Sequence, residues 1–191
     1  MEVIIVAIAS YLMGSIPFGF ILTKIFLKKD IRDIGSGNIG ATNALRTGNK
    51  SLGYGTLFLD VIKAVIPVIY VKLNYPDYVF VTSLCIFLGH VFPIWLKFKG
   101  GKGVATYVGI LFSINITIGF VFIGVLFFTF LISKYSSLSS LFASLSVPIY
   151  LFFFTNQNLI FFSIMFILIF YTHRENIKRL KNKEESKSKI Y

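Results

Sequence analysis

The sequence predicts an all-α polytopic membrane protein, a bundle of seven transmembrane helices with its N-terminus outside and its C-terminus in the cytoplasm. Hydrophobic residues make up 55% of the 191 residues, whereas charged residues make up only 14%. The apolar residues form long runs instead of one stripe with a 3.6-residue period, which is typical of membrane helices. Short polar breaks separate these runs, and Lys and Arg gather in the breaks.

Hydropathy identifies five apolar stretches, at residues 3–26, 52–73, 78–96, 104–132 and 138–171. A hydrocarbon layer of roughly 30 Å needs about 20 apolar residues per helix. The last stretch is too long for one helix, and "TNQN" at 155–158 predicts the polar tip of a helical hairpin. Ser113 and Asn115 predict a weaker break, which leaves a short helix of about ten residues before a full-length one.

The positions of the cations decide between six and seven segments, because cytoplasmic loops of membrane proteins carry an excess of Lys and Arg. A split near Asn115 gives seven segments and leaves only Lys72 clearly outside. An unsplit stretch would export Lys134 and the basic tail. With seven segments, the cytoplasmic side holds Lys28, Lys29, Arg32, Arg46, Lys50, Lys97, Lys99, Lys102, Lys134 and the tail from Arg174 to Lys189.

The same pattern predicts one transmembrane domain at 1–180 and a basic polar cytoplasmic tail at 181–191. The N-terminus has Glu2 and no basic region before its apolar run, which favours a retained helix over a cleaved signal. The single cysteine, Cys85, lies in an apolar segment, so it supports neither a disulfide framework nor a cysteine metal site. The net charge of +11 is explained by the loops, and we expect no nucleic-acid partner, no metal and no cofactor.

The first polar cluster is "IGSGNIGATNALR", residues 34–46. Successive glycines allow backbone amides to point to a common centre, and such nests bind anions, phosphate above all. The planar guanidinium group of Arg46 is suited to bidentate hydrogen bonds with phosphate oxygens. A flexible loop with helix-capping residues is the plainer interpretation. The expected phosphate ligands are Gly35, Ser36, Gly37, Asn38, Gly40, Thr42, Asn43 and Arg46.

The second cluster, "FKGGKGVAT" at 98–106, repeats this arrangement. Lys99 and Lys102 flank the pair Gly100 and Gly101, and Gly103 opens a helix whose N-terminus favours an anion. Because Gly103 follows Lys102 where a Walker loop needs Ser or Thr, the pattern disfavours nucleotide hydrolysis. The alternative is that the lysines only anchor the membrane interface.

Polar residues inside the predicted spans have two interpretations each. His90, in "GHVFP", is expected about two turns before the end of its helix, either as a packing hydrogen bonder or as a site residue. Asp60 and Lys63 lie three residues apart on one helix face, as a structural ion pair or as a wall of a polar site.

Two further clusters are expected on the same cytoplasmic side. "KYSSLSSL" at 134–141 begins a helix, with Ser136 and Ser137 as capping residues and with Ser137 and Ser140 on one face. "HRENIKRL" at 173–180 places His173 and Asn176 one turn apart, where both can face one site. Its cations point at lipid headgroups.

Taken together with "GSIPFG" at 14–19, these motifs resemble the acyl-phosphate-dependent glycerol-3-phosphate acyltransferase family of bacterial membranes, in order and over nearly the whole chain. The resemblance implies a seven-helix bundle with a cytoplasmic active site. It also implies transfer of a fatty acyl group from acyl phosphate to the 1-hydroxyl of glycerol 3-phosphate, which yields lysophosphatidic acid and phosphate for phospholipid synthesis. An enzyme that supplies acyl phosphate is the implied functional partner.

The resemblance carries over the family's substrate contacts to Ser36, Arg46, Lys102, Ser140, His173 and Asn176. Of these we assign catalysis to Ser36, Arg46, Lys102, His173 and Asn176; Ser137 and Ser140 join the glycine-rich residues and His90 in substrate binding. The tail departs from the family pattern, because Lys183 stands where a glycine is usual, with Glu185 as the possible acid beyond it. The alternative function is a transporter of a phosphorylated small molecule, which should show inverted repeats and helices broken near the midplane. We find no such repeat, and the polar clusters lie at one face.

Overall fold

The computed structural model describes residues 1–187, and every regular element in that range is a helix. The chain packs into two units, one formed by residues 1–114 and one that begins at Asn115. The boundary falls at the polar break that the sequence predicted between residues 104 and 132. Each unit has its own buried core, and each is described separately.

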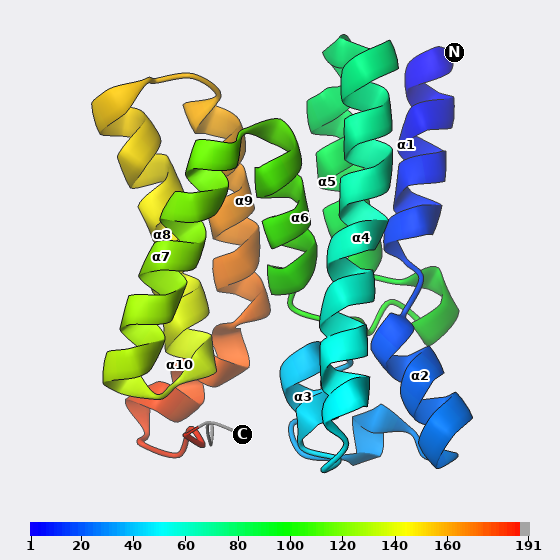
Figure 1. The fold of residues 1–191 in the computed structure, drawn as a ribbon, viewed down its shortest axis with the longest axis vertical. Coiled ribbons are helices and arrows are strands. Elements are labelled where there is room, and N and C mark those ends of the chain that lie inside the picture. The colour runs from blue at the N-terminus through cyan, green and yellow to red at the C-terminus, as the bar shows by residue number, and fades with distance from the viewer. Residues whose placement is uncertain (188–191) are drawn as a thin grey trace. The chain divides into compact units, whose positions relative to one another are not determined.

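The first unit is built on four helices that pack side by side, α1, α4, α5 and α6 (Figure 1). Because the chain reverses direction between them, its two long polar loops, residues 28–49 and 92–103, leave the helices at the same end. Its elements are α1 (Glu2–Gly14), α2 (Phe18–Leu27), η1 (Ile31–Asp33), α3 (Ala41–Leu45), α4 (Lys50–Asn74), η2 (Pro76–Tyr78), α5 (Val79–Val91), η3 (Ile94–Leu96) and α6 (Val104–Ile114).

The first apolar stretch differs from its prediction, because it forms two helices instead of one. The chain leaves the helix after Gly14 and re-enters it at Phe18. Pro17 explains the break, since proline has no N–H to donate and forces the preceding residue out of the α-helical region. The break leaves the carbonyl of Ile16 available to a side chain from another helix.

The third stretch is also shorter than predicted. Helix α5 ends at Val91, and the chain continues through Phe92 and Pro93 into the short helix η3. Pro93 again excludes the helical conformation at the residue before it. His90 therefore lies in the last turn of α5, and the expected position two turns before the helix end is wrong.

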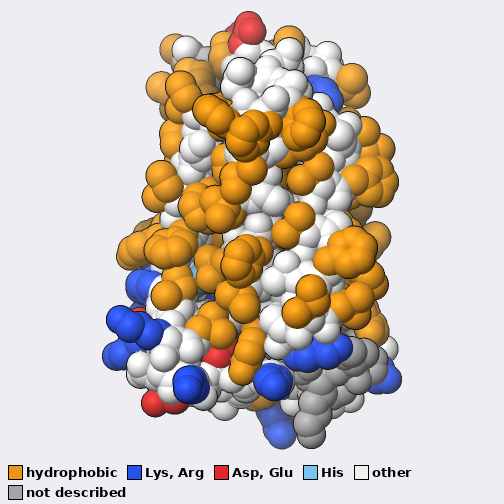
Figure 2. Space-filling view, turned by 90° about the vertical axis from the view of Figure 1, so that its left-hand side faces the viewer, with side chains coloured by type: hydrophobic (Ala, Val, Ile, Leu, Met, Phe, Trp, Pro, Cys, Tyr) orange, Lys and Arg blue, Asp and Glu red, His pale blue; other side chains and the backbone are white. Residues whose placement is uncertain are grey.

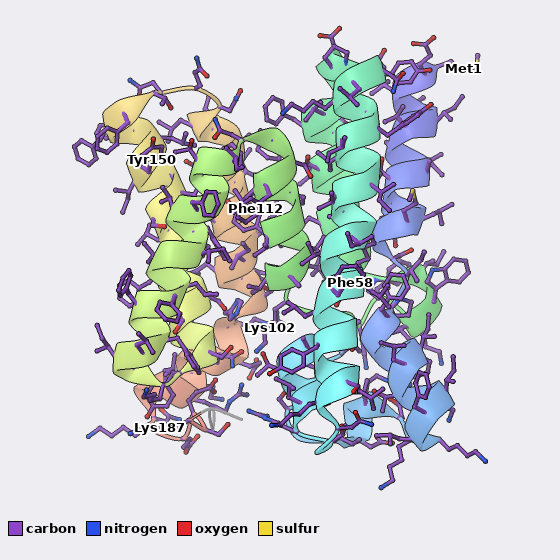
Figure 3. All side chains as sticks on the ribbon, viewed as in Figure 1. Met1, Phe58, Lys102, Phe112, Tyr150 and Lys187 are labelled. Atoms are coloured by element: carbon purple, nitrogen blue, oxygen red, sulfur yellow. The ribbon has the colours of Figure 1, made fainter. Side chains whose placement is uncertain are left out.

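The second unit contains α7 (Ile116–Ser133), α8 (Ser136–Phe154), α9 (Leu159–Thr172) and α10 (Arg174–Lys181). Helix α8 packs between α7 and α9, and α10 packs on both α8 and α9. The structure confirms both breaks that the sequence predicted: Asn115 caps α7 by accepting a hydrogen bond from Thr117 N, and the 155–158 segment joins α8 to α9. Figure 3 shows Tyr150 near the hairpin end of this unit and Lys187 at the α10 end.

The outer surfaces of the helices are apolar, as a lipid environment requires. Only three residues of α7 are buried, and Phe128 and Ile132 are 65% and 87% exposed. Figure 2, a view from the α7 and α8 side, shows hydrophobic side chains over much of the face and most of the Lys and Arg side chains near one end.

Length and composition identify four helical stretches of the described chain that could cross a membrane, or five with the bent pair α9 and α10. Helix α6 is apolar but short, and α4 carries Asp60 and Lys63 in its middle. The count of seven spans and the orientation of the termini stay predictions.

Candidate functional site

The first polar loop is held in shape by the side chain of Asn43, which lies on the short helix α3 and is 3% exposed. Its Oδ1 accepts a hydrogen bond from Ser36 N at 2.9 Å. Its Nδ2 lies 2.8 to 3.0 Å from the carbonyl oxygens of Ile31, Ile34 and Asn38. The amide group thus joins both halves of the loop, and this organising role was not apparent from the sequence.

The glycines of this loop permit its tight path. Gly35 and Gly37 have φ values of +56° and +69°, in the region that favours glycine. A Cβ on Gly35 would lie within 2.8 Å of both Asn43 Oδ1 and Arg46 Cδ, so Arg46 lies directly against this glycine. The side chains of Ser36, Thr42 and Arg46 are exposed at the surface of the loop.

The backbone amides of this loop are largely used inside it. Gly37 N donates to Ile34 O, and Gly40 N donates to Asn38 Oδ1 at 2.9 Å. The expectation that the amides of Ser36, Gly37 and Gly40 form an open anion nest is therefore wrong, since each already has an acceptor.

The backbone amides of the glycine pair in the second loop, Gly100 and Gly101, are also occupied by acceptors within the protein. Gly100 N donates to Val91 O and Gly101 N donates to His90 O, each at 3.1 Å. These carbonyls belong to the last turn of α5, where Pro93 leaves them without helical donors. The amides of Gly100 and Gly101 thus cap α5 and are not directed at a ligand, which corrects the predicted nest.

Close packing explains why this pair is glycine. A Cβ on Gly101 would lie 2.1 Å from His90 Nε2, and one on Gly100 would lie 2.2 Å from His90 O. Lys102 follows directly, and Gly103, at φ +84°, turns the chain into α6. In Figure 3, Lys102 lies just before α6, away from the end of the first unit that holds Met1.

The two loops of the first unit are in contact. Leu96, from η3 in the second loop, packs in one buried cluster with Ile31, Ile39 and Ala44 of the first loop. Lys102 and Arg46 therefore belong to adjoining loops at one end of this unit, which is what the sequence predicted for its two glycine-rich motifs.

A buried charged cluster lies behind the glycine pair. Lys63 Nζ is 2.8 Å from Asp60 Oδ1 and 3.0 Å from His90 Nδ1, and it donates to Ile16 O at 2.9 Å. All three side chains are no more than 3% exposed. His90 is thus a hydrogen-bonding residue of the core, as one of its two interpretations expected, and its ring also contacts Gly101. A role for His90 in substrate binding stays a prediction.

In the second unit, the carboxylate of Glu185 forms hydrogen bonds with three polar side chains, two of which, Ser137 and Asn176, are predicted site residues. Its Oε1 accepts hydrogen bonds from Ser137 Oγ at 2.7 Å and Asn176 Nδ2 at 2.6 Å, and its Oε2 accepts one from Arg179 Nε at 2.7 Å. The predicted tail is therefore packed against α8 and α10 at Glu185; residues 188–191 of that tail lie outside the described range. The sequence had indicated Glu185 only as a possible acid.

These contacts change the acidity of Glu185. Burial raises the pKa of its carboxyl group, but the hydrogen bonds from Ser137, Asn176 and Arg179 outweigh burial and hold the pKa below its ordinary value of 4.5. The group is therefore a carboxylate at neutral pH.

The remaining predicted residues of this unit make local contacts. His173 is 1% exposed, and its Nδ1 lies 2.8 Å from Ile169 O, which orients the ring. Ser140 Oγ donates to Ser136 O. Tyr135 is the N-cap of α8 and makes no side-chain cap, so the capping role expected of Ser136 and Ser137 is wrong. Among residues 1–187, no group of three or more His, Cys, Asp or Glu side chains is placed to hold a metal ion.

The fold and these sites define an integral membrane protein in which apolar helices carry polar loops with Arg46 and Lys102 at one end of the first unit, and with His173 and Asn176 near one end of the second. Residues 4–183 match the family described as glycerol-3-phosphate acyltransferase.

The relatives agree with this match. A glycerol-3-phosphate acyltransferase of Pelagibacter ubique is 79% identical over 100% of both chains, and one of Bradyrhizobium diazoefficiens is 48% identical over 94% of this chain and 92% of the relative. The structure is similar to crystal structures of PlsY (YgiH), an integral membrane glycerol 3-phosphate acyltransferase, in its glycerol 3-phosphate form and in its lysophosphatidic acid form. The TM-scores are 0.92 and 0.88, at 35% identity, with 98% of this chain and 96% and 95% of the other chains covered. The protein belongs to the glycerol-3-phosphate acyltransferase family, and it is an acyltransferase of the membrane.

Proposed function

We propose that this acyltransferase moves a fatty acyl group from acyl phosphate to the 1-hydroxyl of glycerol 3-phosphate, with lysophosphatidic acid and inorganic phosphate as products. One observation carries the proposal: both reactants contain phosphate, and two adjoining loops of the first unit supply Arg46 and Lys102. The similarity to a structure in a glycerol 3-phosphate form and another in a lysophosphatidic acid form supports this choice of acceptor and product.

Each predicted residue has a proposed role that fits its contacts. Arg46 and Lys102 bind phosphate oxygens, and Ser36 and Thr42 add hydroxyl donors from the exposed side of the first loop. The first turn of α6, after Gly103, adds the favourable field of a helix N-terminus. Asn38, Asn43, Gly35, Gly37, Gly40, Gly100 and Gly101 shape the two loops.

Within the second unit, we assign polar roles to four predicted residues. His173 and Asn176 act as polar groups toward the reacting atoms, and Ser137 and Ser140 lie on the same face of α8. Asn176 Oδ1 is buried and has no hydrogen-bond partner within the described structure, so this atom is able to accept a hydrogen bond from a substrate hydroxyl.

The proposed reaction needs alignment more than activation. Acyl phosphate is a mixed anhydride, so its carbonyl carbon is already a good electrophile, and correct placement of the hydroxyl removes roughly 7 to 11 kcal/mol of the barrier. The 1-oxygen forms the new C–O bond while the C–O bond to phosphate breaks. The departing phosphate takes the hydroxyl proton, and Arg46 and Lys102 stabilise its charge. This chemistry requires no cofactor.

We place the protein in the cytoplasmic membrane, with seven segments, the N-terminus outside and the site on the cytoplasmic face. The cations of the loops after α2 and α5 support this orientation, whereas Lys72 lies at the other end of α4. An enzyme that makes acyl phosphate then supplies the donor from the same side.

The direct test supplies purified protein in detergent with acyl phosphate and glycerol 3-phosphate, and measures phosphate and lysophosphatidic acid. We expect equal amounts of both products. The double variant Arg46→Ala, Lys102→Ala should lose nearly all turnover, whereas Lys29→Ala, Lys97→Ala, which removes two exposed cations nearby, should keep it. Wild-type protein that releases no phosphate would favour a transporter of phosphorylated molecules instead.

The orientation has its own test. In a Cys85→Ala background, single cysteines at Lys29, Lys97 and Gln157 are labelled with an impermeant maleimide in oriented vesicles. Lys29→Cys and Lys97→Cys should react only from the cytoplasmic side, and Gln157→Cys only from outside. Labelling of positions 29 and 97 from opposite sides would contradict the proposed site.

A further inference from the structure

The buried cluster of Asp60, Lys63 and His90 connects four parts of the first unit. Asp60 and Lys63 lie on α4, and His90 lies in the last turn of α5. Lys63 also donates to the carbonyl of Ile16, in the break between α1 and α2. The imidazole of His90 in turn contacts Gly101 in the loop that carries Lys102.

The geometry of Lys63 fixes the orientation of the histidine ring. The Lys63 ammonium donates to Ile16 O, lies 3.0 Å from His90 Nδ1 and forms an ion pair with Asp60 Oδ1 at 2.8 Å. Nδ1 of His90 faces Lys63 and Asp60, and Nε2 is the nitrogen that faces Gly101. The contacts at Nδ1 thus hold the imidazole ring in the direction that places Nε2 against Gly101.

Packing alone does not account for these residues. Buried ion pairs are often no more stabilising than apolar side chains of the same volume, and charged groups within membrane helices are costly. A charged cluster additionally fixes the orientation of its side chains, because hydrogen bonds require particular distances and angles. Here the oriented group is the imidazole of His90, and the residue packed on it is Gly101.

The glycine pair is held to α5 from two sides. Its amides donate to the carbonyls of His90 and Val91, and Gly101 lies against the His90 ring. Lys102 is the next residue along the chain, between this pair and the start of α6. The contact between His90 and Gly101 therefore helps to set the path of the chain into Lys102.

We infer that Asp60, Lys63 and His90 are positioning residues that hold Lys102 at the phosphate site. This inference rests on the proposed function, in which Lys102 binds phosphate. The cluster touches no reactant itself, and it acts through the glycine pair.

The test uses the full-length double variant Asp60→Asn, Lys63→Met, which removes both charges together and leaves the ring of His90 in place. Its control is Ser83→Ala, another buried polar residue of α5, whose hydroxyl donates to Val79 O. At a temperature where circular dichroism shows all proteins folded, we expect kcat/KM of the double variant to fall about 10- to 100-fold, the size of effect that a misplaced catalytic group produces. The control should stay within about twofold.

A double-mutant cycle with Lys102→Arg separates positioning from general destabilisation. If the cluster acts through Lys102, most of its effect should disappear when Lys102 is already replaced. The inference would be overturned if the loss of kcat/KM in the combined variant equalled the product of the losses from the cluster variant and from Lys102→Arg. A wild-type kcat/KM in the cluster variant Asp60→Asn, Lys63→Met would overturn it as well. Should the double variant fail to fold, His90→Asn serves the same cycle, because its amide keeps an acceptor for Lys63 but lacks the ring beneath Gly101.

The single tryptophan of the chain supplies a measurement that needs no activity. Trp95 lies in η3, in the same loop as Lys102, and is 61% exposed. We expect the fluorescence anisotropy of Trp95 to fall in the double variant and to stay unchanged in Ser83→Ala. If wild-type protein releases no phosphate, the proposed function fails, whereas an unchanged anisotropy rejects the positioning of the loop by itself.

Discussion

Glu185 offers a sharp test of the second unit, because one carboxylate joins α8, α10 and the chain after α10. Glu185→Ala removes its hydrogen bonds to Ser137 and Asn176, each about 1.5 kcal/mol for a bond to a charged group. It also removes the pair with Arg179, which contributes at most ~1 kcal/mol because the arginine side chain is 37% exposed. The expected loss is therefore about 3 to 4 kcal/mol.

In a domain of this size, 1 kcal/mol shifts the melting temperature by about 2 to 4 °C. We therefore expect circular dichroism of the full chain in detergent to show a decrease of about 6 to 16 °C for Glu185→Ala. Glu184→Ala is the matched control, because it removes the same charge at an exposed neighbouring position. Equal melting temperatures for the two variants would refute the reasoning.

The pH dependence of this difference follows from the lowered pKa of Glu185. A carboxyl group whose pKa is lower in the folded state stabilises the protein above its unfolded pKa, near 4.5, and this contribution is lost as the pH falls through the folded pKa. The difference between wild type and Glu185→Ala should therefore be constant from pH 6 to 8 and become smaller only below about pH 4.5. A difference that shrinks between pH 6 and 8 would show that another group is responsible.

Three further substitutions test particular contacts by thermal unfolding. Asn43→Asp should destabilise the protein more than Asn43→Ala, because the aspartate would place an oxygen against three carbonyl oxygens; the reverse order would rule out the assigned amide orientation. Lys183→Gly should stabilise it by about 0.5 to 1 kcal/mol, since Lys183 has φ +60° where glycine fits without strain, and a loss of stability would contradict this. Lys72→Met should cost about 1 to 2 kcal/mol, as Lys72 donates to Ser113 O and Ile114 O at the end of α6, whereas no change would mean that these carbonyls need no cap.

The sequence was sufficient for features that depend on local chemistry. Asn115 and the 155–158 segment stopped helices where polar residues interrupt an apolar run, and the loops of the first unit met at one end because the helices alternate in direction. The proline breaks were misplaced for a related reason. Pro17 and Pro93 were visible, but whether a proline bends or ends a helix depends on which groups satisfy the carbonyls it leaves.

The roles of the glycine-rich loops could not be read from their composition. The same glycines permit amides that point outward to an anion or inward to the protein, and tertiary contacts choose between these. Here Val91 O and His90 O take the amides of the glycine pair, and Asn43 takes that of Ser36. Glu185 was hard to assign because its partner Ser137 is 48 residues away in the sequence.

The position of Asp60 along α4 has a consequence for how its charge is compensated. Ten residues separate Asp60 from Lys50, where the helix begins, and at 1.5 Å per residue this is about 15 Å. Asp60 and Lys63 thus lie about three turns or more inside the helix, where they are 2% and 3% exposed. Solvent therefore contributes little to the compensation of these charges, which depends on Asp60 and Lys63 facing each other beside His90.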